Sequence, residues 1–257
     1  MEELNIHITH STCGECGETV KPHHRFCFNC GAFLGGEGER IDVFNNSQLR
    51  HAFVFYSLYL FICLMVKYTE WFGNYDHLFW IELLLAAITV SFAIANRRNV
   101  RPLLSFRGFS PLITAGIVLL AILFSFLVNL LVHELNVSLF HSDVSFYRGY
   151  RIYIAPRLLM VYSIALMPAL FEELAFRGVL YGYLAEVMDE KLVMIITGFI
   201  FAAMHLNFIS LIWLIPFGIF LGFLRKKYHT LWYGVIFHFV FNLVACLIDL
   251  YNEGVLF

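Results

Sequence analysis

Seven apolar windows follow one another through most of this chain, and they constrain its fold more than any other feature. The windows lie at residues 52–66, 78–95, 112–132, 158–184, 192–204, 209–224 and 231–248. The chain is 60% hydrophobic and 14% charged, whereas a soluble domain has about 45–50% apolar and about 25% charged residues. The sequence therefore predicts an all-α, multi-pass membrane protein, with the lipid bilayer as its surroundings.

Several of these windows are shorter than the ~20 residues that a perpendicular span needs, or they carry polar groups. Such windows fit a bundle around a polar cavity better than independent helices exposed to lipid. We predict seven transmembrane helices within residues 49–257. An eighth results if the window at 158–184 divides near Pro168, which cannot donate to the carbonyl of Ile164 and should kink the helix.

The distribution of basic residues predicts the orientation in the membrane. Two connections are rich in arginine and lysine: they contain Arg97, Arg98, Arg101, Arg107, Arg225, Lys226 and Lys227. Basic connections of multi-pass proteins face the cytoplasm, so we expect these connections and the N-terminus on the cytoplasmic side of the cell membrane. The formal net charge of −2 argues against nucleic acid as a partner.

The polar N-terminus carries two Cys-x-x-Cys turns, formed by Cys13, Cys16, Cys27 and Cys30. Four thiolates at this spacing are typical of a structural zinc site, and the glycines that follow Cys16 and Cys30 suit tight turns. Two disulfides or free thiols are the alternatives, although a disulfide framework is typical of secreted proteins. We predict a zinc ribbon at residues 1–33 and a glycine-rich linker at 34–48. The four cysteines suffice as ligands, although His7, His10, His23 and His24 could substitute for them.

Six polar side chains lie in or directly after three of the last four windows: Glu172, Glu173, Arg177, His205, His238 and Asn242. Each ionisable residue in a membrane helix costs ~2.5–3.5 kcal/mol on insertion scales, and such residues usually serve function. Residues four apart share a helix face, so Glu173 can pair with Arg177, and His238 lies beside Asn242. Together they could provide a base, a charge clamp and an oxyanion site, the groups that a hydrolase within a membrane needs.

Each of these residues also has a structural interpretation. A Glu–Arg pair at helical spacing more often stabilises a helix than acts in catalysis, and a lone histidine in an apolar helix often bonds a backbone carbonyl. An asparagine there commonly links two helices. Their occurrence together on consecutive segments favours a functional site, with Glu173 and Arg177 in the structural role.

The three segments EELAFRG, FAAMH and HFVFN resemble the signatures of the CPBP family, the CAAX protease and bacteriocin-processing group of intramembrane glutamic endopeptidases. These signatures are Glu-Glu-x-x-x-Arg, Phe-x-x-x-His and His-x-x-x-Asn, and they occur here in that order. The resemblance covers about residues 110–250 and leaves the N-terminal ribbon unexplained.

This resemblance implies a role for each residue. Glu172 would be the general base that activates water, assisted by His205, while His238 and Asn242 would form the oxyanion site. Glu173 and Arg177 would support the helix. The substrate would be a membrane-bound or leader-bearing peptide, and the family points to a catalytic site without metal.

Two other functions are compatible with the same residues. Glu172, His205 and His238 are a valid ligand set for a zinc-dependent intramembrane metalloprotease. Alternatively, the fold could serve as a non-catalytic immunity or scaffold protein, because fold resemblance alone does not establish chemistry. The sequence gives no prediction of the oligomeric state.

Overall fold

A computed structural model describes residues 11–20, 27, 29–34, 46–70, 75–106, 109–141 and 145–256. The chain divides into two compact units, Met1–Asn46 and Ser47–Phe257. The four histidines proposed as substitute zinc ligands lie outside the described residues, as does Arg107. Most of the predicted linker also lies outside them, so the boundaries at residues 33 and 48 stay predictions.

The first unit is built on a small hairpin. Strands β1 (Ser11–Thr12) and β2 (Thr19–Val20) pair antiparallel, with Ser11 opposite Val20. Val20 packs with Cys13 and Cys27 in a core to which Ala32 and Leu34 add. So small a core cannot supply much stability, and it makes this unit dependent on a further cross-link such as a metal.

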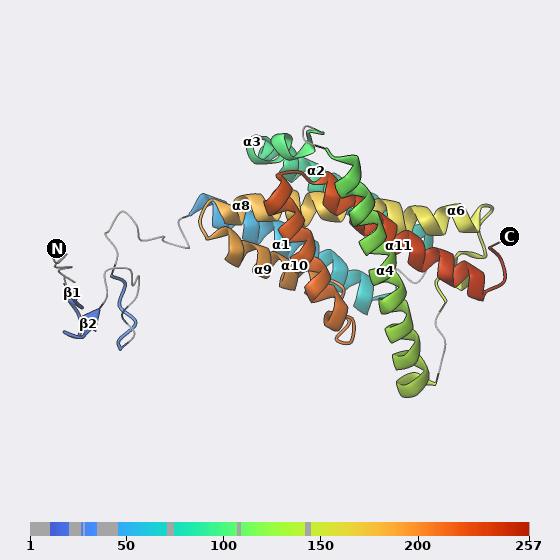
Figure 1. The fold of residues 1–257 in the computed structure, drawn as a ribbon, viewed down its shortest axis with the longest axis horizontal. Coiled ribbons are helices and arrows are strands. Elements are labelled where there is room, and N and C mark those ends of the chain that lie inside the picture. Colours follow the sequence, from blue (N-terminus) through green and yellow to red (C-terminus); the bar gives the residue numbers. More distant parts are fainter. Residues whose placement is uncertain are drawn as a thin grey trace, which may run out of the picture. The chain divides into compact units, whose positions relative to one another are not determined.

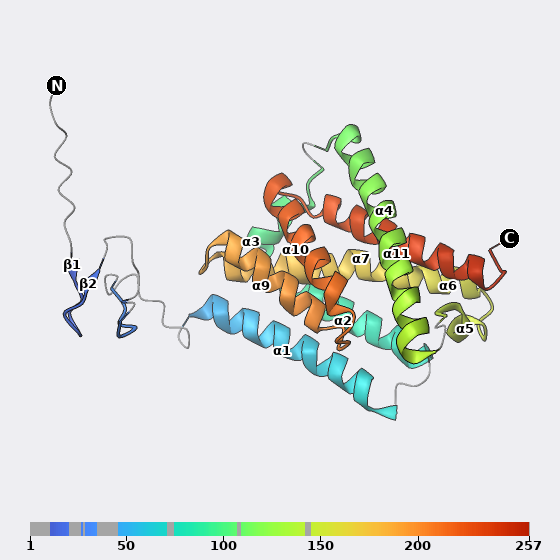
Figure 2. The ribbon, with the colours of Figure 1, turned by 60° about the horizontal axis from the view of Figure 1, so that its bottom comes forward.

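The second unit is helical (Figures 1 and 2). Its first half contains α1 (Ser47–Tyr68), α2 (Tyr75–Ala95), α3 (Arg97–Val100), η3 (Arg101–Leu104), α4 (Pro111–Leu135), η4 (Asn136–Phe140) and α5 (Tyr147–Tyr150). Its second half contains α6 (Pro156–Val161), η5 (Tyr162–Leu166), α7 (Met167–Glu172), η6 (Glu173–Leu180), α8 (Tyr181–Ala185), α9 (Glu190–Ala203), α10 (Leu211–Tyr228) and α11 (Trp232–Asn252). All seven apolar windows are thus helical, and the predicted fold class is confirmed.

The predicted count of seven or eight spans is not confirmed. Among the described residues, five helices are long and apolar enough to cross a membrane: Ser47–Tyr68, His77–Ala95, Pro111–Ser138, Pro156–Ala185 and Trp232–Asn252. Helix α9 has only 14 residues, and the last turn of α10 contains three basic residues. The window at 158–184 does not divide at Pro168.

The helix Pro156–Ala185 contains two segments with π-helical in place of α-helical hydrogen bonding. Segments η5 and η6 are π-helical, and the short α7 with Pro168 lies between them. Such widened turns inside α-helices occur where backbone groups find partners outside the helix, and often at functional sites. Here η6 contains Glu173 and Arg177.

Helices α9 and α10 pack closely side by side (Figure 2). A Cβ atom on Gly198 of α9 would lie 2.8 Å from the backbone nitrogen of Ile219, and one on Gly218 of α10 would lie 2.8 Å from the carbonyl oxygen of Gly198. Only glycine allows backbones to approach so closely. This contact brings the carbonyl of Gly218 toward η6.

Candidate active site

Glu173 and Arg177 lie at the centre of a buried polar network. Both side chains are fully buried, and Arg177 Nη1 donates to Glu173 Oε1 over 3.0 Å. Arg177 Nη2 donates to the carbonyl oxygen of Gly218 over 3.0 Å. His238 Nδ1 lies 3.1 Å from the same Glu173 Oε1. The pair predicted from the four-residue spacing therefore also joins η6 to α10 and α11.

Glu172 differs in its exposure from Glu173, whose Oε2 likewise has no hydrogen-bond partner among the described residues. The Glu172 side chain keeps 27% of its exposure, yet Oε2 is buried and has no hydrogen-bond partner among the described residues. This oxygen lies 4.0 Å from Nε2 of His238, which is too long for a direct hydrogen bond. A water molecule that contacts both atoms could bridge such a gap.

His205 lies just after the end of α9, where its ring packs against Phe201, which also contacts His238. The Nδ1 atom of His205 is 3.1 Å from the carbonyl oxygen of Phe201, and its imidazole is exposed. The ring of Phe201 is 5.1 Å from that of His205 and 6.0 Å from that of His238, edge-on in both cases. The guanidinium of Arg177 also lies over this ring, 4.3 Å from its centre.

Phe201 is therefore a positioning residue that the sequence analysis did not single out, since it contacts Arg177, His205 and His238. Its signal was present, because it is the first residue of the Phe-x-x-x-His segment. Gly234 is a second such residue. A Cβ atom there would lie 2.8 Å from Glu173 Oε2, so only glycine leaves room for this carboxylate.

Asn242 lies one turn beyond His238 on α11. Its Nδ2 donates to the carbonyl oxygen of Ile164 over 2.8 Å. This is the carbonyl that Pro168 cannot serve, because proline has no backbone N–H. The amide side chain thus replaces the missing backbone donor and joins α11 to η5, while the second hydrogen on Nδ2 stays available to another acceptor.

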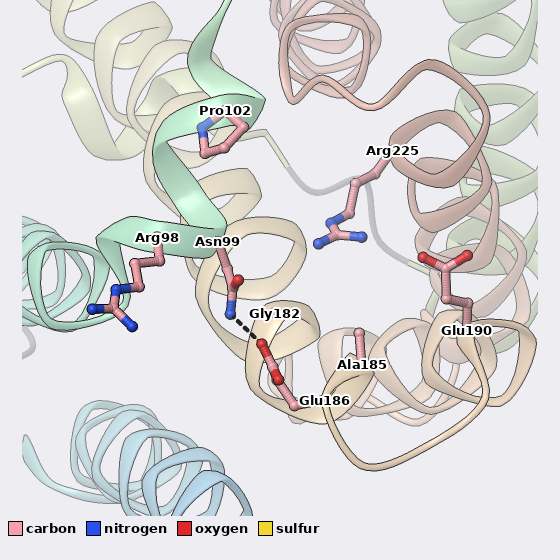
Figure 3. Close-up of a pocket in the computed structure, with 8 residues that line it drawn as sticks. All are labelled: Arg98, Asn99, Pro102, Gly182, Ala185, Glu186, Glu190 and Arg225. Atoms are coloured by element: carbon pink, nitrogen blue, oxygen red, sulfur yellow. Dashed lines mark hydrogen bonds between the residues drawn. The ribbon is translucent and has the colours of Figure 1, made fainter.

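A cavity of about 240 Å³ lies at the C-terminal end of the long helix Pro156–Ala185 (Figure 3). Arg98 and Arg225 line it together with Glu186, which accepts a hydrogen bond from Asn99. Arg225 Nε donates to the carbonyl oxygen of Arg177 over 2.6 Å. Arg225 therefore stabilises the C-terminal part of η6. The two arginines that line the cavity come from the two basic connections.

The four N-terminal cysteines can bind a metal ion. Their sulfur atoms all lie within 4.8 Å of one another, with 3.7 Å between Cys13 and Cys30 and 3.6 Å between Cys16 and Cys27. Four sulfurs at ~2.3 Å from a tetrahedral Zn²⁺ would be about 3.8 Å apart. A hydrogen bond from the backbone N–H of Glu18 lowers the pKa of the Cys16 thiol to about 7.

Both cysteine turns have the same backbone geometry. Gly17 and Gly31 have φ angles of +72° and +75°, which favour glycine, and their N–H groups donate to the carbonyls of Cys13 and Cys27. Elsewhere among the described residues, no three His, Cys, Asp or Glu side chains are gathered closely enough to hold a metal. Glu172, His205 and His238 thus do not form a ready ligand set.

Comparison with known proteins supports the resemblance. Residues 154–244 match the family described as Type II CAAX prenyl endopeptidase Rce1-like. This segment contains all three signature segments, so the resemblance to the CPBP family is confirmed, and the family implies an intramembrane endopeptidase of the CAAX type. Neither the curated proteins nor the solved structures gave a match.

Proposed function

Because residues 154–244 match a family of intramembrane endopeptidases, we propose that this protein hydrolyses a peptide bond of a membrane-associated protein or peptide with water activated by Glu172. One observation carries the proposal: Glu172 Oε2 is buried, lacks a hydrogen-bond partner among the described residues, and faces Nε2 of His238 at 4.0 Å. A buried acceptor without a partner is costly, and a bound water removes that cost while lying beside its base.

His205 assists in proton transfer. A backbone carbonyl can only accept, so the Nδ1 atom of His205 that contacts the carbonyl of Phe201 carries the proton. In the neutral ring, Nε2 is then free to accept a proton. Because the imidazole is exposed, it can pass this proton to the leaving amine.

His238 and Asn242 stabilise the oxyanion. Glu173 Oε1 accepts from Arg177 Nη1 and, as a carboxylate oxygen, also accepts from Nδ1–H of His238. Nε2 of His238 therefore donates to the oxyanion when it too carries a proton. Asn242 contributes its second Nδ2 hydrogen. Loss of one such donor costs about 2.7–4 kcal/mol of transition-state stabilisation.

The reaction then runs in two steps. Water attacks the peptide carbonyl carbon and gives its proton to Glu172, and the carbonyl oxygen becomes the oxyanion held by His238 and Asn242. The C–N bond breaks as the leaving nitrogen takes up a proton, through His205 or directly from Glu172. The products are a free carboxylic acid and an amine.

The ribbon is proposed to hold zinc, since a set of four cysteines at this spacing is the usual structural zinc site. The N-terminus and the basic connections are proposed to be cytoplasmic. The position of Arg98 and Arg225 in one cavity (Figure 3) supports this orientation, because it places both basic connections at the same end of the helical unit.

The test compares new protein N-termini in membranes of cells that express the wild type, Glu172→Gln or Glu186→Gln. Glu186 is an exposed glutamate bonded to Asn99 and controls for loss of one charge. We expect cleavage products with the wild type and Glu186→Gln and none with Glu172→Gln. Products that persist in Glu172→Gln would exclude Glu172 as the base.

A further inference from the structure

A cavity of about 470 Å³ lies at the other end of the long helix from that of Figure 3. Four aromatic side chains line it, two from α2 and two from the segment around α5, together with one glutamate and one serine. They are Phe79, Trp80, Tyr150, Tyr153, Glu82 and Ser163. Aromatic faces beside a carboxylate form the usual recognition site for an organic cation.

Glu82 is not used by the proposed mechanism. It lies half-buried on a candidate membrane span, and Ser163 Oγ donates to its Oε2 over 3.2 Å. None of the described lysines, arginines or histidines forms an ion pair with it, unlike Glu173, Glu190 and Glu253. A carboxylate in an apolar helix without a cationic partner is complementary to a cation that arrives with a ligand.

The aromatic wall of the cavity is held by the C-terminal end of α11. Asp249 accepts a hydrogen bond from the backbone N–H of Tyr147 over 2.8 Å, and Arg148 and Arg151 bind Glu253 over 2.8 and 3.1 Å. These contacts fix the segment that carries Tyr150. The cavity is thus preformed, which lowers the entropy cost of binding.

The cavity is also placed correctly for a substrate of Glu172. Ser163 and Glu172 belong to the same continuous helix, nine residues apart, which corresponds to roughly 13 Å along its axis. An extended peptide advances about 3.3–3.6 Å per residue, so this distance corresponds to about four residues.

Building on the proposed function, we propose that this cavity binds a lysine or arginine side chain of the substrate peptide, about four residues from the cleaved bond. Glu82 supplies the opposite charge, and the aromatic side chains contact the aliphatic stem and the face of the cation. The site makes Glu82 a specificity-determining residue.

The test measures binding to the Glu172→Gln variant in dodecyl maltoside micelles, so it does not depend on proteolysis. The probes are two nine-residue peptides of alanine and leucine with one central lysine or norleucine. Trp80, 66% exposed in the cavity wall, reports binding by its fluorescence. A charge-assisted contact predicts at least tenfold tighter binding of the lysine peptide.

Substitutions locate the preference. When Glu82→Gln is combined with Glu172→Gln, the preference for the lysine peptide over the norleucine peptide should fall to twofold or less. When Glu186→Gln is combined with Glu172→Gln, this preference should stay unchanged. Trp80→Ala, at an exposed position that folding tolerates, should reduce the preference for the lysine peptide several-fold. Because this variant lacks the reporting tryptophan, its binding is measured with a labelled peptide. Equal affinities of the two peptides overturn the proposal even if the protein is a protease, as does a preference that survives Glu82→Gln.

Two further results complete the test. If added phosphatidylethanolamine binds in a Glu82-dependent way while the lysine peptide shows no preference, the cavity is a lipid headgroup site and the peptide assignment is wrong. In wild-type membranes, mapped cleavage sites should show lysine or arginine about four residues from the cut. Failure to observe any cleavage there contradicts the proposed function, not the binding site.

Discussion

Two adjacent glutamates have opposite surroundings, and this difference assigns them different work. Glu173 Oε1 contacts Arg177 and His238 in a fully buried network. Glu172 keeps partial exposure and its Oε2 lies 4.0 Å from His238 Nε2, while Oε2 of both glutamates has no hydrogen-bond partner among the described residues. Neutralising Glu173 should therefore affect stability, whereas neutralising Glu172 should affect only the chemistry.

Glu173→Gln should lower the free energy of unfolding by about 3–5 kcal/mol, because it leaves the buried Arg177 without its counter-charge. Glu172→Gln should leave the thermal midpoint within a few degrees of the wild type and abolish cleavage. Thermal unfolding of both purified variants provides the check. Equal stability of Glu173→Gln and the wild type would show that the ion pair does not hold the helix.

Gly234→Ala tests the space that Glu173 requires. The added methyl group would lie 2.8 Å from Glu173 Oε2, and overpacking of this kind costs about 1–3 kcal/mol. The matched control is Gly116→Ala on α4, where no atom lies within 4 Å and alanine is the better helix former. We expect lower stability and activity for Gly234→Ala only; a neutral effect at both positions would contradict the geometry.

At the scale of elements, sequence reasoning located the long helices but neither the short ones, such as α3 and α5, nor the interactions that shape the long ones. The apolar windows are long, and their hydropathy is read directly from composition. The span count is not confirmed, because α9, with 14 residues, reaches only about 21 Å, short of the ~30 Å apolar layer, and the last turn of α10 carries three basic residues. The π segments were not predictable, since the partner of Ile164 lies 78 residues away on α11.

The contact between Asn242 and Ile164 predicts a double-variant result. Asn242→Ala alone leaves a carbonyl unpaired and should destabilise the protein by about 1–3 kcal/mol. In a Pro168→Ala background a backbone N–H becomes available again, so Asn242→Ala should cost less. Activity should stay about 10²–10³-fold reduced in the double variant if Asn242 is an oxyanion donor. Recovery of activity with stability would assign Asn242 a purely structural role.

The link between α5 and the end of α11 should depend on pH. Hydrogen bonding from Arg148, with the charge of Arg151 nearby, lowers the pKa of Glu253 below its usual value. A lowered pKa in the folded state contributes stability that is present above the usual pKa and is lost as the pH falls through the folded value. Asp249 is the other acidic group at this junction.

Glu253→Gln should thus lower the thermal midpoint at neutral pH, and the difference from the wild type should shrink as the pH falls below about 4.3, the usual glutamate value. Thermal unfolding of the variant and the wild type, from neutral pH to below pH ~4, measures this difference in midpoint. A difference that stays constant between neutral and strongly acidic pH would contradict the ion-pair explanation.

On the scale of the whole molecule, the two units have separate cores. In the helical unit, a broad cluster of buried apolar side chains includes Phe55, Phe176, Phe201 and Phe217. The N-terminal unit has the small cluster around Cys13, Val20 and Cys27. Sequence reasoning identified the cysteine set because its spacing is local. The polar network of the helical unit depends on contacts between α9, α10 and α11, so only its members could be predicted.

This separation leads to a prediction for metal removal. Zinc should be present at one ion per chain, and its loss should unfold the N-terminal unit, because a metal of this kind supplies most of the folding free energy of such a small ribbon. Since the helical core contains none of its residues, Cys27→Ser should abolish zinc binding and expose residues 11–34 to proteolysis. The thermal midpoint of the helical unit should stay unchanged.

Cys63→Ser on α1 is the control that retains zinc. Metal analysis and limited proteolysis of both variants test this. Full zinc content in Cys27→Ser would contradict Cys27 as a zinc ligand, and a lower helical midpoint would show that the two units depend on each other.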